Sequence, residues 1–210
     1  MACEGVGEVM LKRIFDICLS SVGIIGSLPL WVFFFLAILI GDGRPIFYLQ
    51  ERVGKNGKIF KALKFRSMIK DAEKETGPVQ AVENDPRVTI AGRILRSTAM
   101  DELPQLINIL KGDMSFVGPR ALRPEEKEVH GNPDETNIED IPGYKERLTL
   151  MPGLTGIAQV YLPTDALRSE KFRYDLLYIK KQSFLLDLKL IFLSFWITFR
   201  GKWESRRKKL

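Results

Sequence analysis

The residues with the clearest chemical potential are two adjacent carboxylates, Asp101 and Glu102, in the segment "RSTAMDELPQL". Carboxylates at the start of a helix accept hydrogen bonds from unpaired amides, so helix capping alone explains one of them. Four basic residues indicate more than capping: Arg96 at the start of this segment, and Lys64, Arg66 and Arg120 in other segments. Carboxylates that can hold a divalent cation, together with several cationic side chains, are the groups that a diphosphate requires.

This combination predicts phosphoryl transfer. Mg²⁺ can neutralise phosphate charge, and a carboxylate within reach of phosphorus can itself attack to form an acyl phosphate. The sequence has no Walker A loop, no GxGxxG fingerprint and no kinase signature, so a nucleotide would be held in another way. The one histidine, His130, is in a polar, turn-rich stretch, which argues against histidine-based catalysis.

The chain of 210 residues is long enough for one compact domain with an appended segment. Its formal charge of +6 favours negatively charged partners such as lipid head groups, nucleotides or nucleic acid. The two cysteines, Cys3 and Cys18, form no CxxC or Cys/His cluster, which argues against a disulfide scaffold and a zinc site and fits a reducing compartment.

A membrane segment is predicted near the N-terminus, where residues 17–41 carry no formal charge and exceed the roughly 20 residues that cross a bilayer core. Pro29 cannot donate a backbone hydrogen bond to Ile25, so the helix should kink or break there, and Ser27 can supply a hydroxyl to the loosened backbone. Membrane-spanning helices tolerate proline, so a spanning and a re-entrant helix both remain open at this point. Eight basic residues against two acidic ones in residues 42–70 place the following domain in the cytoplasm.

Two β-favouring runs around residues 54–57 predict a hairpin, with Gly54 and Gly57 at turn positions that need positive φ. A helix is expected over residues 89–97. A second helix should begin at Asp101 or Glu102 and end at Gly112. Its predicted apolar face consists of Leu103, Leu106, Ile107 and Leu110. The glycines of "LMPGLTGIAQV" predict close backbone approach, with ordinary turns as the alternative.

The last segment, residues 183–210, predicts an amphipathic helix. Its apolar residues recur at helical spacing, while Asp187 and Lys189 argue against a spanning helix. We expect a helix that lies in the membrane interface, followed by a basic tail that attracts anionic lipid. A core helix with a solvated tail is the alternative. The apolar residues are Phe184, Leu188, Ile191, Phe195 and Phe199.

Taken in order, several segments resemble a small monotopic phosphoglycosyl transferase of the bacterial sugar transferase family. They are "LKRIFDI", the apolar run with Pro29, "FKALKFRSM", "RSTAMDELPQLINILKGDMSFVGPR", "PGLTGIAQV" and "KFRYDLLYIKKQSFLLDLKLIF". The resemblance implies transfer of a phosphosugar from a UDP-sugar to polyprenyl (undecaprenyl) phosphate with release of UMP, initiating glycoconjugate biosynthesis. It also implies a location at the bacterial inner membrane.

The resemblance further implies roles for matching residues. Asp101 would be the nucleophile that forms a covalent phosphosugar intermediate, and Glu102 its partner at a Mg²⁺ site. Lys64, Arg96 and Arg120 would hold phosphates. The helix broken at Ser27 and Pro29 would be re-entrant. The implied fold is mainly α with a small β-hairpin (α+β): a membrane helix in residues 1–42, a cytoplasmic catalytic domain in 43–182, and an interfacial helix with a basic tail in 183–210.

The sequence departs from the family pattern at Leu28, at Ala121 and at residues 161–163, which read Tyr-Leu-Pro where Asn-Gly-Arg is usual. These departures leave a second reading open, a non-catalytic membrane-surface adaptor or inactive relative that binds anionic lipids. Nucleic-acid binding is disfavoured because the basic residues are spread along the chain and form no known module. The sugar, the oligomeric state and the pathway do not follow from the sequence.

Overall fold

The structure is a computed structural model that describes residues 6–72, 85–124 and 137–201. His130, Cys3 and the basic residues beyond residue 201 therefore lie outside the described residues. The helices are α1 (Val6–Gly26), α2 (Leu28–Gly41), α3 (Ile90–Ser97), α4 (Gln105–Lys111), α5 (Tyr144–Arg147), α6 (Ile157–Tyr161), α7 (Arg168–Lys181) and α8 (Phe184–Phe199). The strands are β1 (Phe47–Val53), β2 (Ile59–Phe65), β3 (Ser115–Val117) and β4 (Gly153–Thr155), and the 3₁₀ turns are η1 (Lys55–Gly57), η2 (Met100–Glu102) and η3 (Ile138–Asp140).

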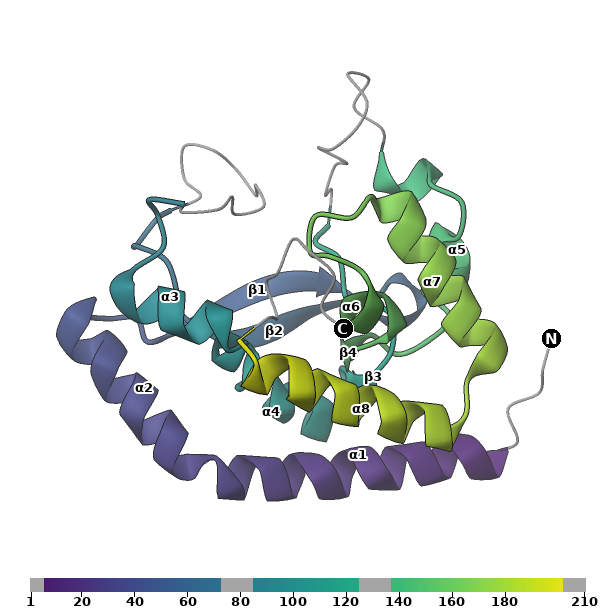
Figure 1. Cartoon of the computed structure of the whole chain (residues 1–210), viewed down its shortest axis with the longest axis horizontal. Helices are drawn as coiled ribbons and strands as arrows, with labels where there is room; N and C mark the ends of the chain where they lie inside the picture. The colour runs from purple at the N-terminus through teal and green to yellow at the C-terminus, as the bar shows by residue number, and fades with distance from the viewer. Residues whose placement is uncertain (1–5, 73–84, 125–136, 202–210) are drawn as a thin grey trace.

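The first two helices form a bent pair along one side of the molecule, with the remaining elements on the inner side of the bend (Figure 1). Their axes differ by 59° at Ser27, which confirms the predicted break. Pro29 lies in the first turn of α2, where its missing N–H leaves no hydrogen bond unmade. The Ser27 hydroxyl donates to the carbonyl oxygen of Gly23 at 2.6 Å and accepts from the Trp31 indole at 3.0 Å. The break is therefore bridged by a side chain.

Neither described helix is by itself long and apolar enough to cross a bilayer, and only α1 and α2 together meet that criterion. One stripe of α2 packs on the domain, because Phe34 and Ile38 are buried in a cluster with Phe65 of β2 and Leu95 of α3. The rest of α2 carries exposed large apolar side chains: Leu28, Leu30, Val32, Phe33, Phe35, Leu36 and Ile40.

The predicted hairpin is confirmed: β1 and β2 pair antiparallel, from Phe47 opposite Phe65 to Val53 opposite Ile59. Gly57 has the predicted positive φ of 77°, but Gly54 does not, since its φ is −101°. The need at Gly54 is for space, because a Cβ there would lie 3.0 Å from the carbonyl oxygen of Lys58.

The first predicted helix after the hairpin, residues 89–97, is confirmed as α3, with the Thr89 side chain capping it. The prediction for the second helix is wrong at its start, because Asp101 and Glu102 lie in the turn η2 and α4 begins only at Gln105. Pro104 has no N–H to bond to Met100, and the Leu103 N–H takes that carbonyl instead at 3.2 Å. A 3₁₀ turn therefore carries both carboxylates.

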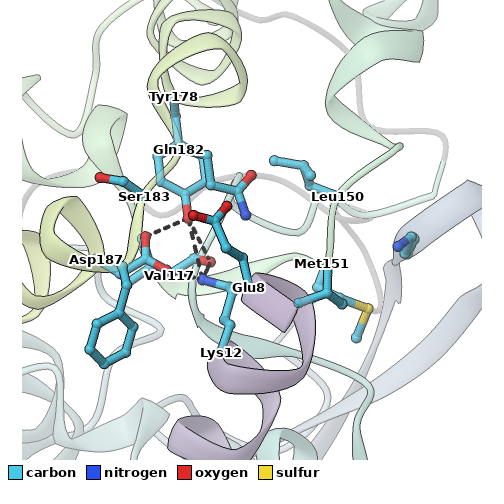
Figure 2. Close-up of a pocket in the computed structure, with 12 residues that line it drawn as sticks. Glu8, Lys12, Val117, Leu150, Met151, Tyr178, Gln182, Ser183 and Asp187 are labelled. Carbon is cyan, nitrogen blue, oxygen red and sulfur yellow. Dashed lines mark hydrogen bonds and ion pairs between the residues drawn. The ribbon is translucent and has the colours of Figure 1, made fainter. Parts of the chain in front are cut away.

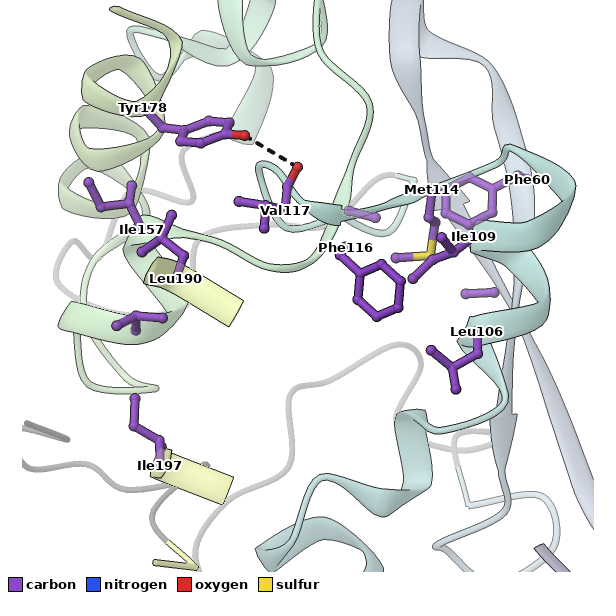
Figure 3. Close-up of a cluster of buried hydrophobic side chains, with 13 residues drawn as sticks. Phe60, Leu106, Ile109, Met114, Phe116, Val117, Ile157, Tyr178, Leu190 and Ile197 are labelled. Atoms are coloured by element: carbon purple, nitrogen blue, oxygen red, sulfur yellow. Dashed lines mark hydrogen bonds between the residues drawn. The ribbon is translucent and has the colours of Figure 1, made fainter. Parts of the chain in front are cut away.

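The end of α4 is at Gly112, as predicted, with a φ of 92°. Its predicted apolar face is partly wrong: Leu106 and Ile109 are buried, whereas Leu110 is exposed. Leu106 and Ile109 join a core cluster with Phe116 and other residues of β3, α6, α7 and α8 (Figure 3).

A short parallel pair, β3 and β4, forms the centre of this core, where three glycines allow the backbone segments to touch. A Cβ on Gly118 would lie 2.2 Å from the carbonyl oxygen of Met151, one on Gly153 would lie 2.1 Å from the Gly118 nitrogen, and one on Gly156 would lie 2.3 Å from the Gly118 oxygen. The predicted close approach in residues 150–160 is confirmed.

Helix α8 confirms the predicted C-terminal helix, and its one carboxylate, Asp187, faces inward, whereas Lys189 is exposed. Asp187 is buried beside Leu190 and Ile197, whereas Phe192, Phe195 and other large apolar residues are exposed. A water-soluble helix shows the opposite distribution, so the outer face of α8 fits contact with an apolar medium.

Candidate active site

The site is centred on Glu102, whose carboxylate is buried between two cations from different parts of the fold. Lys64 at the end of β2 donates to Oε1 from Nζ at 2.7 Å, and Arg120 after β3 donates to the same oxygen from Nη2 at 2.7 Å. A second Arg120 nitrogen lies 3.4 Å from Oε2. The structure therefore brings together three of the predicted site residues: Lys64, Glu102 and Arg120.

The electrostatics of this cluster keep Glu102 ionised. Burial by itself would raise the pKa of the Glu102 carboxyl, but the charges of Arg120 and Lys64 outweigh it and hold that pKa well below its ordinary value. Burial lowers the pKa of the Lys64 ammonium, and the Glu102 charge opposes this effect. Because the Arg120 side chain is 39% exposed, the cluster still presents positive charge to an incoming anion.

Asp101 lies beside this cluster but differs from Glu102 in its surroundings. Asp101 is half-buried, whereas Glu102 is 6% exposed. The negative charge of Asp101 opposes the effect of burial on the pKa of Lys64. A half-buried carboxylate beside two cations is compatible with the predicted role of Asp101 as a nucleophile, which stays a prediction. Arg96, the remaining predicted phosphate ligand, lies half-buried on the last turn of α3.

The loop that carries Arg120 is held by four consecutive carbonyl oxygens, each bonded to a different group. Pro119 accepts from the Gly153 N–H at 2.9 Å, Arg120 from Arg147 at 2.6 Å, Ala121 from Arg52 at 2.8 Å, and Leu122 from the Val53 N–H at 2.8 Å. The backbone that positions the Arg120 guanidinium is therefore fixed by β1, β4 and α5.

Arg52 and Arg147 were not among the predicted site residues. Arg147 is 4% exposed, forms an ion pair with Asp175 at 3.0 Å and lies over the Phe172 ring at 4.6 Å. Burial lowers the pKa of the Arg147 guanidinium, an effect that Asp175 opposes. In the sequence, Arg52 counts only as one of many basic residues after the membrane segment, and nothing local marks Arg147.

Asn108 connects the carboxylate-bearing turn to the hairpin. Its amide nitrogen donates to the Lys61 carbonyl at 2.8 Å, and its amide oxygen accepts from the Leu63 N–H at 2.9 Å. Asn108 is on α4, which follows Glu102, and its partners immediately precede Lys64 on β2. These bonds set the distance between Glu102 and Lys64.

The predicted Mg²⁺ site at Asp101 and Glu102 stays a prediction. Among the described residues, no group of three or more His, Cys, Asp or Glu side chains is arranged to hold a metal ion. Mg²⁺ is commonly held by one or two carboxylates plus substrate phosphates, so this pair is compatible with it. Since Oε1 of Glu102 already accepts from two cations, Asp101 is the more accessible ligand.

A pocket lies in a different part of the molecule, between the start of α1 and the junction of α7 and α8 (Figure 2). Lys12, Met151, Tyr178 and Asp187 are among its lining residues, and none of the predicted site residues is.

The unusual segment at residues 161–163 begins with Tyr161, which is partly exposed at the end of α6, and continues with Leu162, which is buried.

The fold and this cluster define a class: an α+β protein with an apolar, bent N-terminal helix pair and a buried carboxylate held between two cations. The chain belongs to the bacterial sugar transferase family, whose family model matches residues 7–201. The family resemblance seen in the sequence is thereby confirmed.

Individual relatives agree with this assignment. The chain is 34% identical over 197 residues to the exopolysaccharide production protein ExoY of Rhizobium meliloti (strain 1021), which covers 87% of this chain and 83% of the relative. It is 40% identical over 200 residues to a UDP-glucose:undecaprenyl-phosphate glucose-1-phosphate transferase of Klebsiella pneumoniae, covering 93% of this chain and 41% of that protein.

A third relative is an undecaprenyl-phosphate galactose phosphotransferase of Salmonella typhimurium (strain LT2), 36% identical over 196 residues, covering 87% of this chain and 39% of that protein. The chain thus spans about two fifths of the length of the latter two relatives.

Proposed function

We propose that this protein transfers a sugar phosphate from a UDP-sugar to polyprenyl phosphate, giving a polyprenyl-diphosphate sugar and UMP. By their names, the Klebsiella pneumoniae and Salmonella typhimurium relatives act on undecaprenyl phosphate, and the first of these two uses UDP-glucose. The observation that carries the proposal is the half-buried Asp101 beside the buried Glu102, Lys64 and Arg120 cluster.

The proposed reaction has two steps. A carboxylate oxygen of Asp101 attacks the phosphorus that bears the sugar, and the bond from this phosphorus to the oxygen of UMP breaks. After UMP leaves, a phosphate oxygen of the polyprenyl phosphate attacks the same phosphorus, and the bond to Asp101 breaks to regenerate the carboxylate. Each step forms one P–O bond and breaks one.

In this scheme the cations bind rather than react. Arg120 and Lys64 neutralise the phosphate oxygens, and Glu102 holds both cations in place. Arg96 on α3 would add a phosphate contact at the other side of Asp101. A bound Mg²⁺, held by Asp101 and Glu102, would supply further charge neutralisation of the diphosphate.

The test is UMP release from a panel of UDP-sugars with polyprenyl phosphate, comparing the wild type with Asp101→Asn. The exchange removes the nucleophilic charge and should lower turnover by about 10³-fold or more, with unfolding temperature unchanged. A radiolabelled phosphosugar should remain on the wild-type chain when the lipid acceptor is withheld. Full activity of Asp101→Asn would exclude it as the nucleophile. A wild type that releases no UMP from any donor would favour the adaptor reading.

We also propose that α1 and α2 enter the cytoplasmic membrane and return, so that the catalytic domain faces the cytoplasm. The exposed apolar side chains of α2 and α8 and the basic residues 42–70 support this arrangement. A cysteine placed near residue 5 should then react with a membrane-impermeant reagent only from the cytoplasmic side. Reaction only from the outside would establish a spanning helix.

A further inference from the structure

The membrane-proximal helix α1 is bonded directly to the strand that leads into Arg120. Lys12 and Asp16 are four residues apart, so they share one face of α1. Lys12 donates from Nζ to the Val117 carbonyl oxygen at 3.1 Å, and Asp16 accepts from the Phe116 N–H at 3.1 Å. Both partners are in β3, immediately before the residues Gly118, Pro119 and Arg120.

The Lys12 ammonium is held by a cluster of polar groups that lines the pocket (Figure 2). It is ion-paired to Asp187 of α8 and lies 3.3 Å from the hydroxyl of Tyr178 on α7. That hydroxyl donates to Asp187 Oδ1 at 2.6 Å. The Lys12 and Asp187 side chains are only 19% and 5% exposed. Three helices and β3 thus meet at one buried ion pair.

The neighbouring residue Arg13 bonds α4, the helix that follows the carboxylate-bearing turn. It donates to the carbonyl oxygens of Ile109 and Leu110 at 2.6 and 2.8 Å, at the C-terminal end of α4. A cation at this end is favourable because the last carbonyls of a helix have no partners of their own. Helix α4 follows the turn that carries Asp101 and Glu102, so α1 is bonded to both segments that form the site.

Burying an ion pair to join α1 to the domain has no clear advantage for stability, because apolar residues of similar size would serve as well or better. A cation and a carboxylate can do something that apolar packing cannot: they can bond named backbone groups and fix the register of β3 against α1. The pattern therefore favours positioning over simple attachment.

We propose that Lys12 and Asp16 are positioning residues that set the place of Arg120 through β3, so that the pose of the membrane helix controls the site. The inference rests on the proposed function, since Arg120 is its phosphate-binding group. It assigns a role in the reaction to the "LKRIFDI" segment, beyond its charge and its place beside the apolar run.

The experiment uses the full chain in lipid nanodiscs and compares Lys12→Met with Lys189→Met. Lys189 is an exposed lysine on α8, so its exchange removes the same charge without touching β3. Lys12→Met should lower kcat for UMP release by about 10- to 100-fold, the scale of a group misplaced by about 1 Å, and leave KM for the donor largely unchanged. Lys189→Met should keep both constants.

The decisive comparison is made in an Arg120→Met background. If Lys12 acts through Arg120, adding Lys12→Met to the Arg120→Met variant should lower kcat little further. The guanidinium that Lys12 positions is already absent from that variant. Equal losses in both backgrounds would overturn the proposal and leave Lys12 a stability residue. The double variant Lys12→Met with Asp187→Leu removes both charges and keeps the fold testable, and it should show the same kcat loss as Lys12→Met.

A second readout does not depend on the reaction. Hydrogen exchange of the backbone amides in residues 115–122 should rise in Lys12→Met and stay at the wild-type level in Lys189→Met. Unchanged exchange would overturn the coupling even if the protein is an active transferase. Raised exchange in a protein that releases no UMP would refute the proposed function while retaining the link between α1 and β3.

Discussion

Two buried carboxylates in this molecule, Glu102 and Asp187, are each paired with a lysine but differ in the exposure of their second partner. Glu102 is held by Lys64 and by Arg120, whose side chain is 39% exposed, and Asp101 beside it is half-buried. Asp187 is held by Lys12 and the Tyr178 hydroxyl, and Tyr178 is 1% exposed.

The difference separates a site for substrate from a site for assembly. In the Glu102 cluster, the Arg120 side chain is 39% exposed, so under the proposed function a phosphate could bind without breaking the fold. In the Asp187 cluster, Lys12 and the Tyr178 hydroxyl contact the carboxylate, and both also contact the Val117 carbonyl oxygen (Figure 3 shows the bond from Tyr178 to Val117). The Glu102 cluster should therefore govern turnover, and the Asp187 cluster should govern stability and the position of β3.

The largest expected effect is on turnover, from Glu102→Gln. Losing this charge frees Lys64 and Arg120 from their shared anchor, and misplaced phosphate ligands should lower kcat for UMP release by about 10²- to 10³-fold. Because Arg120 can turn toward solvent, the unfolding temperature should fall less than for Asp187→Asn. An active Glu102→Gln with a strongly lowered unfolding temperature would reverse the distinction between the two clusters.

The second effect is on stability, from Asp187→Asn. This exchange leaves the mostly buried Lys12 ammonium without its counter-charge, which should cost about 3 kcal/mol of unfolding free energy. For a chain of this size, that corresponds to a decrease of roughly 6–12 °C in unfolding temperature. Thermal unfolding of the protein in nanodiscs measures it, and the loss of kcat should stay below that of Glu102→Gln. No change in unfolding temperature would contradict a stabilising role for the Asp187 cluster.

The smallest expected effect is on how the free energy of unfolding changes at acidic pH. The pKa of Glu102 is lower in the folded than in the unfolded protein, so the folded state binds fewer protons there. Its contribution to stability is full above the ordinary glutamate pKa of 4.5 and is lost as the pH falls below that value. Denaturant unfolding of the wild type between about pH 5 and pH 2 should therefore show a steeper loss of unfolding free energy than Glu102→Gln. Parallel curves would exclude this contribution.

Several elements could be predicted because their causes are local. The break near Pro29 follows from a missing N–H, the hairpin from two β-favouring runs around a glycine turn, and the end of α4 from Gly112. The pair Asp101 and Glu102 was recognisable from residue types alone. The residue at which α4 begins could not be predicted, because Pro104 changes backbone hydrogen bonds that the apolar pattern does not reveal.

The partners of the charged residues could not be predicted. Lys64 and Arg120 are 38 and 18 residues from Glu102, and Lys12 is 175 residues from Asp187. In the sequence, Lys12 next to an apolar run is typical of a residue that controls membrane topology. Asp187 in a late helix is typical of a polar residue on a solvated face. Both are instead buried against each other.

By itself the sequence determined the family, the residue types of the site and the positions of most helices and strands, because these depend on local chemistry and on motifs of high specificity. Only the tertiary structure decided which cations meet Glu102, that Arg52 and Arg147 hold the loop of Arg120, and that α1 is bonded to β3. The physical reason is that a charge can pair with any opposite charge, and only the folded chain selects the partner by excluding water around one pair.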